Sequence, residues 1–242
     1  KDALPEGNHQ ITFTVTDPAG NVSQPSAPIS FVVDKTQPAP TQTVTINNFT
    51  DDIGGVRGNF ASGTSTDDRN PVLNGTLSQS LVGTQKVAIY QTVDSVTTLA
   101  GHAKVTNTNW EFEVNTGIRD SKTYTYKAQV IDSANNAGPV SNSFDVKVTL
   151  SLTVASQSTL DTTPIVTGST GFKILPGEYL EVSIKGTTYS SKQGEVVVDP
   201  LNNTWYVQIP DNKALAKGKT FDIASVLKAS DGTVLAKDNT VG

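Results

Sequence analysis

Residues 71–76 read Pro-Val-Leu-Asn-Gly-Thr, and residues 164–169 read Pro-Ile-Val-Thr-Gly-Ser. The two hexapeptides share a proline, an aliphatic position and a glycine followed by a hydroxyl residue, and they begin 93 residues apart. Each is followed by a single tryptophan, and Trp110 and Trp205 are 95 residues apart. Self-similarity at a fixed period indicates an array of similar domains.

A second signature is a strand that runs into a turn led by aspartate. It occurs at residues 13–21 (FTVTDPAGN) and 128–136 (AQVIDSANN), with a weaker copy at 226–232 (VLKASDG). Because this signature closes a unit, it divides the chain into three parts. We predict a C-terminal hairpin of a preceding domain plus a linker at residues 1–36, one domain at 37–148 and another at 149–242, with the last strand of the final domain truncated.

The hydrophobic pattern along the chain is almost entirely that of short alternating strands. Alternation predicts strands at residues 9–16, 29–33, 86–91, 110–115, 123–131, 179–185, 195–199, 204–209 and 221–227. One turn of helix is expected at 211–217, with Asp211 as its cap. About seven short strands in about 100 residues is typical of an immunoglobulin-like β-sandwich. We therefore predict an all-β fold of tandem immunoglobulin-like β-sandwich domains arranged as an elongated rod.

The two tryptophans lie in alternating strands, which favours a place in the core over a role in stacking on a ligand. The chain has 242 residues, no cysteine and no methionine, and a formal net charge of −5. Disulfides and thiol chemistry are thus excluded, and the missing methionine leads us to expect a fragment or a processed product. The lysines are scattered and no apolar run approaches a membrane span, so we expect a monomer with no nucleic acid partner and no membrane insertion.

Aspartate accounts for 17 of the 23 acidic residues, and aspartate favours turns. The predicted hairpin carries two aspartates: Asp17 lies in its turn and Asp34 lies at its end. We expect them to meet four from the next domain at the junction around the linker at 35–40 (KTQPAP). These four are Asp51, Asp52, Asp67 and Asp68. Two like charges about 4 Å apart cost roughly 4 kcal/mol at an effective dielectric near 20, so such a group needs positive charge.

Calcium meets that need because it accepts 6–8 oxygen ligands in flexible geometry. Zinc and copper sites are poorly supported, since there is no cysteine and the two histidines, His9 and His102, are isolated and expected on the surface. The residues alone leave two interpretations open, a calcium site or solvated aspartates that form turns. The second junction differs, because alignment of Phe31 with Phe144 places Lys147 where Asp34 stands. There we expect a weak or absent site, with direct packing of residues 147–161 in its place.

Several of these strings resemble bacterial immunoglobulin-like (BIg) repeats of giant non-fimbrial adhesins that Gram-negative bacteria export by type I secretion. The resemblance rests on residues 15–21 (VTDPAGN), 32–40 (VVDKTQPAP), 50–53 (TDDI) and 65–76 (STDDRNPVLNGT). Residues 160–164 (LDTTP) and 183–189 (SIKGTTY) are similar to another variety of repeat in the same proteins. The resemblance implies a surface-exposed, multidomain rod that is stiffened by calcium at its domain junctions. Carried over residue by residue, it implies calcium ligands at Asp17, Asp34, Asp51, Asp52, Asp67, Asp68 and, by the turn match, Asp132.

The function that follows is attachment to host cells or surfaces by a protein that is secreted or held at the bacterial surface. Its expected partners are a host-cell surface receptor or glycan and the neighbouring immunoglobulin-like repeats of the same chain. Two alternatives stay open: a carbohydrate-binding domain in which Trp110, Trp205 or Tyr206 stacks on sugar rings, and an accessory β-sandwich of a large secreted hydrolase. No Gly-x-Ser-x-Gly, phosphate-binding or His-Glu-x-x-His motif is present, so no enzymatic activity is expected.

Overall fold

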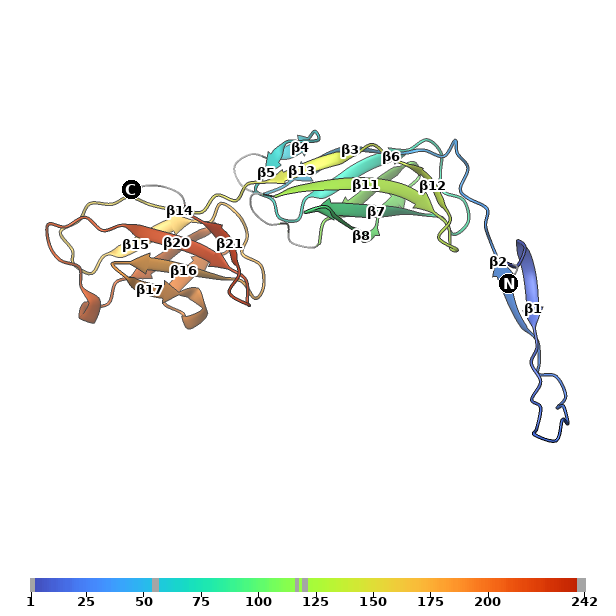
Figure 1. Ribbon diagram of the computed structural model, residues 1–242. Helices are drawn as coiled ribbons and strands as arrows, with labels where there is room; N and C mark the ends of the chain where they lie inside the picture. Colours follow the sequence, from blue (N-terminus) through green and yellow to red (C-terminus); the bar gives the residue numbers. More distant parts are fainter. Residues whose placement is uncertain (1–2, 54–56, 116–117, 119–121, 239–242) are drawn as a thin grey trace.

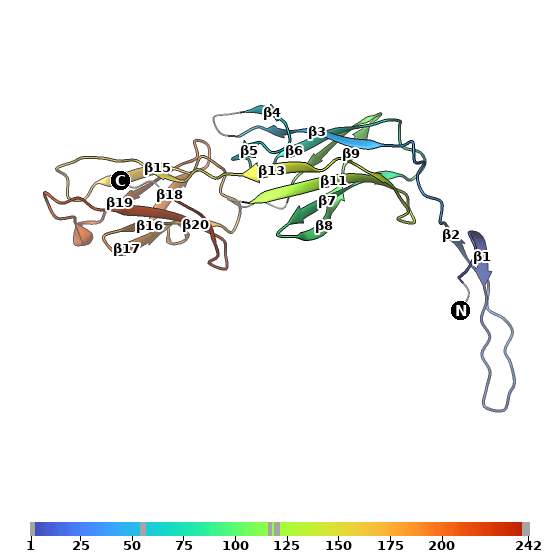
Figure 2. The same ribbon diagram turned by 45° about the horizontal axis from the view of Figure 1, so that its top comes forward.

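A computed structural model describes residues 3–53, 57–115, 118 and 122–238. The fold is all-β, as the alternating pattern predicts, and two short 3-10 helices are the helical elements of the described residues. Figures 1 and 2 show a two-stranded hairpin followed by two β-sandwiches placed one after the other along the chain. That this order produces a stiff rod stays a prediction. No helix among the described residues is long and apolar enough to cross a membrane.

The first sandwich contains two sheets, with strand orders β4-β3-β6-β10-β9 and β5-β13-β11-β7-β8, and β12 pairs with β11. Its strands are β3 (Val44–Asp51), β4 (Gly58–Phe60), β5 (Ser65–Thr66), β6 (Val72–Leu77), β7 (Lys86–Val93), β8 (Val96–His102), β9 (Lys104–Thr106), β10 (Asn109–Glu113), β11 (Thr123–Ile131), β12 (Ala137–Val140) and β13 (Phe144–Val148).

The second sandwich repeats this plan with two four-stranded sheets, ordered β14-β15-β19-β18 and β17-β16-β20-β21. Its strands are β14 (Thr153–Val154), β15 (Ile165–Ser169), β16 (Tyr179–Ile184), β17 (Thr187–Ser190), β18 (Val196–Asp199), β19 (Thr204–Gln208), β20 (Ile223–Lys228) and β21 (Val234–Lys237). The helix expected at 211–217 is a single 3-10 turn, η2 (Asp211–Lys213), and η1 (Ser191–Gln193) is a second one. Pro210, not Asp211, occupies the N-cap of η2, so the predicted cap is wrong by one residue.

The cores confirm the predicted place of both tryptophans, since Trp110 is 3% exposed and Trp205 is 1% exposed. Each indole lies against the glycine of the repeated hexapeptide on the neighbouring strand. A Cβ atom built on Gly75 would lie 2.2 Å from the Trp110 ring, and one on Gly168 would lie 2.3 Å from the Trp205 ring. The repeated glycine is therefore required because the tryptophan ring occupies the space of a side chain.

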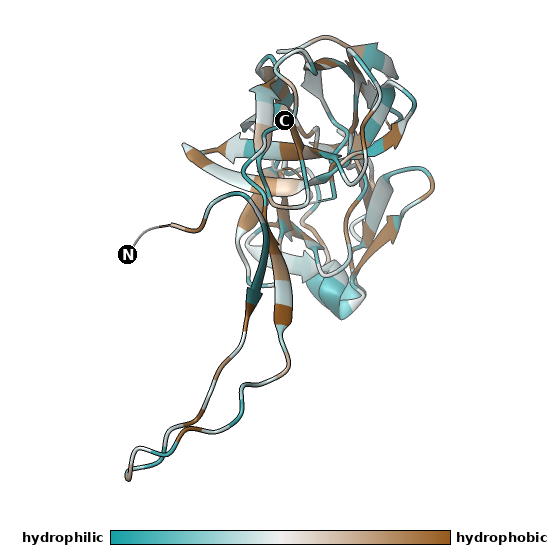
Figure 3. Ribbon diagram, turned by 90° about the vertical axis from the view of Figure 1, so that its right-hand side faces the viewer, coloured by the Kyte–Doolittle hydropathy of each residue, from teal (hydrophilic) through white to brown (hydrophobic). Residues whose placement is uncertain are grey.

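The β1 (Gly7–Ile11) and β2 (Ile29–Val33) hairpin stands apart from both sandwiches, with apolar segments along it (Figure 3). The regular ladder of the predicted strand at 9–16 ends at Ile11. Beyond it, single backbone hydrogen bonds from Ser26 to Phe13 at 2.9 Å and from Ser23 to Val15 at 2.8 Å lead to an isolated bridge between Thr16 and Val22. The hairpin matches the β11–β13 region of the first sandwich, where the equivalent positions lie in the core. In the hairpin they are exposed, for example Val15 at 66% and Ile29 at 56%. An isolated hairpin is marginally stable, and its origin as part of a preceding domain stays a prediction.

Candidate functional site

Strand direction separates the aspartates that the sequence analysis expects at one junction. The linker enters β3 at Val44, and Asp51 ends that strand at the far end of the first sandwich. Asp132 follows β11, which begins beside the end of β13 and runs back toward the linker. Nine residues of β11 span about 26 Å, so Asp51 and Asp132 lie at opposite ends of the sandwich. The expected meeting of all the aspartates at the first junction is therefore wrong.

Asp17 and Asp132 organise two copies of the same turn. Asp17 accepts hydrogen bonds from the backbone N–H groups of Ala19 and Asn21, at 2.9 Å each, and from the Asn21 side chain at 2.8 Å. In the second copy Asn136 donates to Asp132 in the same way, with 2.9 Å from its backbone and 2.9 Å from its side chain. These hydrogen bonds stabilise the charged carboxylates and lower the pKa of both aspartates, the asparagine side chain being the main cause.

At the first junction it is the Asp132 turn that reaches Asp34. The Asn136 side chain donates a 3.1 Å hydrogen bond to the carbonyl oxygen of Asp34. Pro38 of the linker is buried, and its Cβ lies 3.2 Å from the position that a Cβ on Gly138 would take. Asp17 lies at the turn of its own hairpin, while Asp34 follows the other end. The two are therefore one hairpin length apart, and Asp17 lies outside the first junction.

The pairing registers also correct the alignment used for the second junction. His9 pairs with Phe31 in the hairpin, and Tyr124 pairs with Val146 in the first sandwich. With the Asp17 and Asp132 turns superimposed, Phe31 corresponds to Val146, two residues beyond the predicted Phe144. Thr149, not Lys147, therefore stands where Asp34 stands. The prediction that this position carries no carboxylate at the second junction is confirmed, although the residue predicted to occupy it, Lys147, was wrong.

The far end of the first sandwich instead holds buried acidic residues beside the chain segment that leads into the second sandwich. Asp51 is 3% exposed, and its carboxylate accepts hydrogen bonds from the Thr66 hydroxyl at 2.6 Å and the Ile53 N–H at 3.0 Å. Thr66 in turn accepts a 2.9 Å hydrogen bond on its carbonyl from Thr149. A small pocket of about 130 Å³ lies between Asp51, Asp67 and Thr149.

Two further aspartates complete this group. Asp68 is 2% exposed, and burial raises its pKa from 3.8 to about 6, although the backbone N–H of Asn70 donates to it at 2.8 Å. Burial also raises the pKa of Asp67, with a further contribution from the charge of Asp51. Asp52 is exposed, and its negative charge contributes to the raised pKa of Asp68. We call Asp51, Asp52, Asp67 and Asp68 the acidic group. Asp51 and Asp68 are buried, Asp67 is half-buried and Asp52 is exposed, and the charge of Asp51 opposes the ionisation of both Asp67 and Asp68.

Next to the acidic group, a buried ion pair joins the two sandwiches. The Arg69 guanidinium donates two hydrogen bonds to the Glu178 carboxylate, at 2.6 Å and 2.7 Å, and a third to the Ile118 carbonyl at 3.2 Å. The Arg69 side chain is 3% exposed and that of Glu178 is 10% exposed. The backbone N–H of Leu175 also donates to Glu178, at 2.9 Å. Direct packing at the second junction is thus observed. Val148, Leu150 and Leu152 of the predicted segment 147–161 are buried, and Arg69 adds the polar contact between the sandwiches.

The donor chemistry of the acidic group fits calcium, since it consists of carboxylate oxygens, and burial raises the pKa of two of its members, Asp67 and Asp68. In the part of the chain that the structure describes, no group of three or more His, Cys, Asp or Glu side chains is arranged to hold a metal ion. Calcium would therefore require the side chains of the acidic group to turn toward a common point. The two histidines lie outside the acidic group, His102 exposed on β8 and His9 stacked on Phe31.

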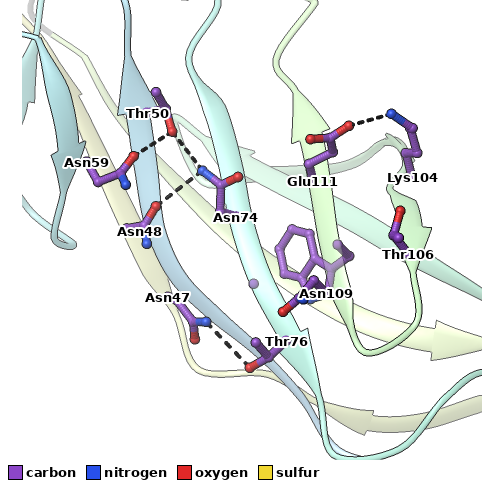
Figure 4. A pocket seen from close by; sticks show the side chains of 12 residues that line it. Asn47, Asn48, Thr50, Asn59, Asn74, Thr76, Lys104, Thr106, Asn109 and Glu111 are labelled. Atoms are coloured by element: carbon purple, nitrogen blue, oxygen red, sulfur yellow. Dashed lines mark hydrogen bonds and ion pairs between the residues drawn. The ribbon is translucent and has the colours of Figure 1, made fainter.

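The structure also reveals a polar groove that the sequence analysis missed. It lies on the outer face of the β4-β3-β6-β10-β9 sheet and has a volume of about 470 Å³ (Figure 4). Asparagine and threonine side chains line most of it. The indole of Trp110 lies beneath, and at 3% exposure it cannot stack on a sugar ring. Trp205 is equally buried, so of the three aromatic residues proposed for stacking only Tyr206, at 44% exposure, is on the surface.

Comparison with known proteins assigns no family to the chain. No family model matches it, and no curated protein matches it. Among solved structures, it is similar to the FN1–FN3 domains of chicken CNTN1, with 12% identity and a TM-score of 0.26 over 95% of this chain and 75% of that one. An α-L-rhamnosidase from Dictyoglumus thermophilum gives 15% identity and a TM-score of 0.26 over 72% of this chain and 27% of that one. The all-β sandwich assignment rests on the strands and sheets themselves.

Proposed function

We propose that this chain is a structural and adhesive segment of a large secreted bacterial surface adhesin, in which calcium stiffens the joint between two immunoglobulin-like sandwiches. The proposal is non-enzymatic, and its calcium role rests on one observation. Asp51 and Asp68 are almost completely buried at the end of the first sandwich, beside the segment that enters the second. Burial of carboxylates without a compensating cation is costly, and a divalent ion at this position would remove that cost.

The expected behaviour follows from the calcium concentrations on the two sides of a membrane. Extracellular calcium domains bind at roughly 10⁻⁴–10⁻³ M, so external calcium fills them while cytosolic calcium does not. Without calcium, mutual repulsion in the acidic group loosens the end of the first sandwich against which the second one packs. With calcium, the carboxylates and the ion pair between Arg69 and Glu178 hold the sandwiches in one orientation. The segment is therefore compliant before export and stiffer afterwards.

Titration calorimetry and small-angle X-ray scattering of the whole chain test this proposal. We expect calcium to bind with a Kd on the order of 10⁻⁴–10⁻³ M and to increase the maximum particle dimension relative to protein in EGTA. Asp68→Asn and Asp51→Asn should each weaken binding, because each removes a charged ligand. Asp211→Asn, in the exposed η2 turn of the second sandwich, is the matched control and should bind as the unmodified chain does.

The same measurements address the first junction. Asp34→Ala should weaken calcium binding at the first junction, where the Asn136 side chain joins the Asp132 turn to Asp34. Identical scattering curves in calcium and EGTA would refute the stiffening role. Unchanged calorimetric heat and stoichiometry in Asp51→Asn and Asp68→Asn would show that the acidic group is not the site.

A further inference from the structure

The polar groove arises from a β-bulge that gives one face of the sheet an extra amide. Ile46 pairs with Gly75 and Asn48 pairs with Asn74, so Asn47 is the inserted residue of β3. Strand alternation would otherwise turn Asn48 toward the core. Instead, Asn47 and Asn48 both contact residues of the outer face. Asn47 donates to the Thr76 hydroxyl at 3.5 Å, and Asn48 accepts from the Asn74 amide at 3.2 Å. Bulges of this kind re-aim side chains and are frequent beside functional sites.

A residue distant in the sequence holds the bulge in place. The Asn142 side chain accepts a 3.0 Å hydrogen bond from the Ile46 N–H and donates a 3.1 Å hydrogen bond to the Ile46 carbonyl. Both backbone groups that a partner strand would normally engage are therefore satisfied by one amide. The extra asparagine of this face is thus a fixed feature of the fold.

The amides of the groove are organised around Asn74. Its side chain donates to the Asn48 carbonyl oxygen, to the Thr50 hydroxyl at 2.9 Å and to the Val72 carbonyl oxygen at 3.0 Å. Thr50 donates onward to Asn59 at 2.7 Å (Figure 4). These contacts orient the side chains before any ligand arrives, which reduces the entropy lost on binding.

The chemistry of the groove selects its ligand. The two charged residues at its rim, Lys104 and Glu111, form a 2.8 Å ion pair and cancel each other, so neither an anion nor a cation is favoured. Strands β6 and β10 pair with a neighbour on both sides. Strand β3 pairs with β4 only over Phe49–Asp51, but the Asn142 side chain engages both backbone groups of Ile46 before that point. An added peptide strand is therefore disfavoured across the centre of the groove.

Asn74 and Thr50 direct their donors to other groups of the protein. What the groove offers a ligand is the amide nitrogens of Asn48 and Asn59 as donors, the Asn74 carbonyl oxygen as an acceptor, and the Asn109 carboxamide as both.

We propose that this groove binds a neutral oligosaccharide, whose adjacent hydroxyl groups match the spaced amides of β3, β4, β6 and β10. The inference stands apart from the proposed calcium role, because the groove lies on a sheet face and shares no lining residue with the acidic group. The groove is open and lacks an exposed aromatic ring, so binding is weak, with a Kd of about 1 mM.

The second sandwich supplies matched controls within the same chain. Counted from the repeated proline, Thr167 takes the place of Asn74. Counted from the tryptophan, Thr204 takes the place of Asn109. Its corresponding surface lacks the asparagine array, and Thr153 and Ser169 bond to each other there at 2.9 Å. A ligand that requires amides should therefore distinguish the two faces.

The test is a ¹H–¹⁵N NMR titration of the whole chain with four neutral tetrasaccharides: chitotetraose, cellotetraose, maltotetraose and mannotetraose. We expect saturable shifts of the side-chain amides of the groove with at least one of them below about 20 mM. Asn74→Ala and Asn109→Ala should each raise the Kd about threefold to tenfold. Thr167→Ala and Thr204→Ala should leave it unchanged.

Measurements in EGTA and in calcium separate this inference from the calcium proposal, because sugar binding is expected in both. Asn109 is exposed, and its side chain makes no hydrogen bond within the described residues, so its replacement tests binding without affecting the fold. Absence of saturable shifts with all four sugars would overturn the inference. So would shifts confined to the second sandwich, or equal losses in the Asn74 and Thr167 variants.

Discussion

Replacement of Arg69 with methionine tests how far the ion pair between the sandwiches fixes their arrangement. The substitution keeps most of the aliphatic volume but removes the three hydrogen bonds that the guanidinium donates. Glu178, whose side chain is 10% exposed, is left with the Leu175 N–H as its remaining described donor. Removal of one partner from a buried pair costs about 3–5 kcal/mol, because an uncompensated charge stays behind.

That cost has an upper limit in this molecule. If the second sandwich undocks, Glu178 returns to water and the penalty disappears. The measured loss of stability then equals either about 3–5 kcal/mol or the free energy of docking between the two sandwiches, whichever is smaller. We therefore expect Arg69→Met to uncouple the two sandwiches rather than to unfold either one. The double variant Arg69→Met/Glu178→Leu should recover most of the coupling, because apolar replacement of a whole buried pair is often neutral or stabilising.

The chain is well suited to the assay, since each sandwich contains one tryptophan of the two in the sequence. Trp205→Phe leaves a fluorescence reporter in the first sandwich, and Trp110→Phe leaves one in the second. Urea unfolding of each background, with and without Arg69→Met, measures whether the two transitions coincide. We expect the urea midpoints of the two sandwiches to lie further apart in the single variant Arg69→Met than in the double variant. Equal midpoints in all three proteins, or equal separation in the single and double variants, would refute the reasoning.

Two further predictions concern the core and the acidic group. Gly75→Ala should destabilise the first sandwich by about 3 kcal/mol or more, because its Cβ would lie 2.1 Å from the Thr45 carbonyl oxygen and 2.2 Å from the Trp110 ring. Urea unfolding followed by Trp110 fluorescence measures this, and a loss below about 1 kcal/mol would contradict it. For Asp68, the folded pKa of about 6 exceeds the ordinary 3.8, so the native state holds its proton longer than the unfolded state. In EGTA the free energy of unfolding of the unmodified chain should therefore fall relative to that of Asp68→Asn as pH rises from about 4 to about 6. Above that interval the difference between the two proteins should stay constant. A thermal-melting difference that does not vary over this interval would count against it.

Local structure followed from the sequence wherever alternation was strong. The strands at 29–33 and 123–131 were predicted with the bounds that the structure gives, and both tryptophans were correctly placed in the core. These successes share a cause, because side chains on a strand alternate between core and solvent. The pattern is local and can be read from a few neighbouring residues. The interrupted pairing after Ile11 was missed because alternation in the sequence continues to Thr16.

The candidate site was harder to predict because it depends on which way each strand runs. Proximity in the sequence suggested that Asp34 and Asp51 share a junction, but β3 carries Asp51 to the opposite end of the sandwich. The polar groove was hidden for a related reason. Its extra amide depends on a bulge that Asn142 stabilises from 96 residues away, and no local pattern records that contact. The ion pair of Arg69 was hidden as well, because its partner Glu178 is 109 residues distant in the sequence.

The two sandwiches differ in the side chain at the position that makes the ion pair between them. The backbone contact that places Arg69, a hydrogen bond from Ile118 to its carbonyl at 3.1 Å, has an equivalent in the second sandwich from Leu215 to Thr162 at 2.7 Å. The scaffold therefore repeats, while the side chain at this position changes from a guanidinium to a hydroxyl. Threonine cannot form a bidentate ion pair with a carboxylate. The two sandwiches thus share this backbone contact but differ in the side chain that it positions, so the result expected for Arg69→Met applies to the joint that Arg69 forms and not to the matching end of the second sandwich.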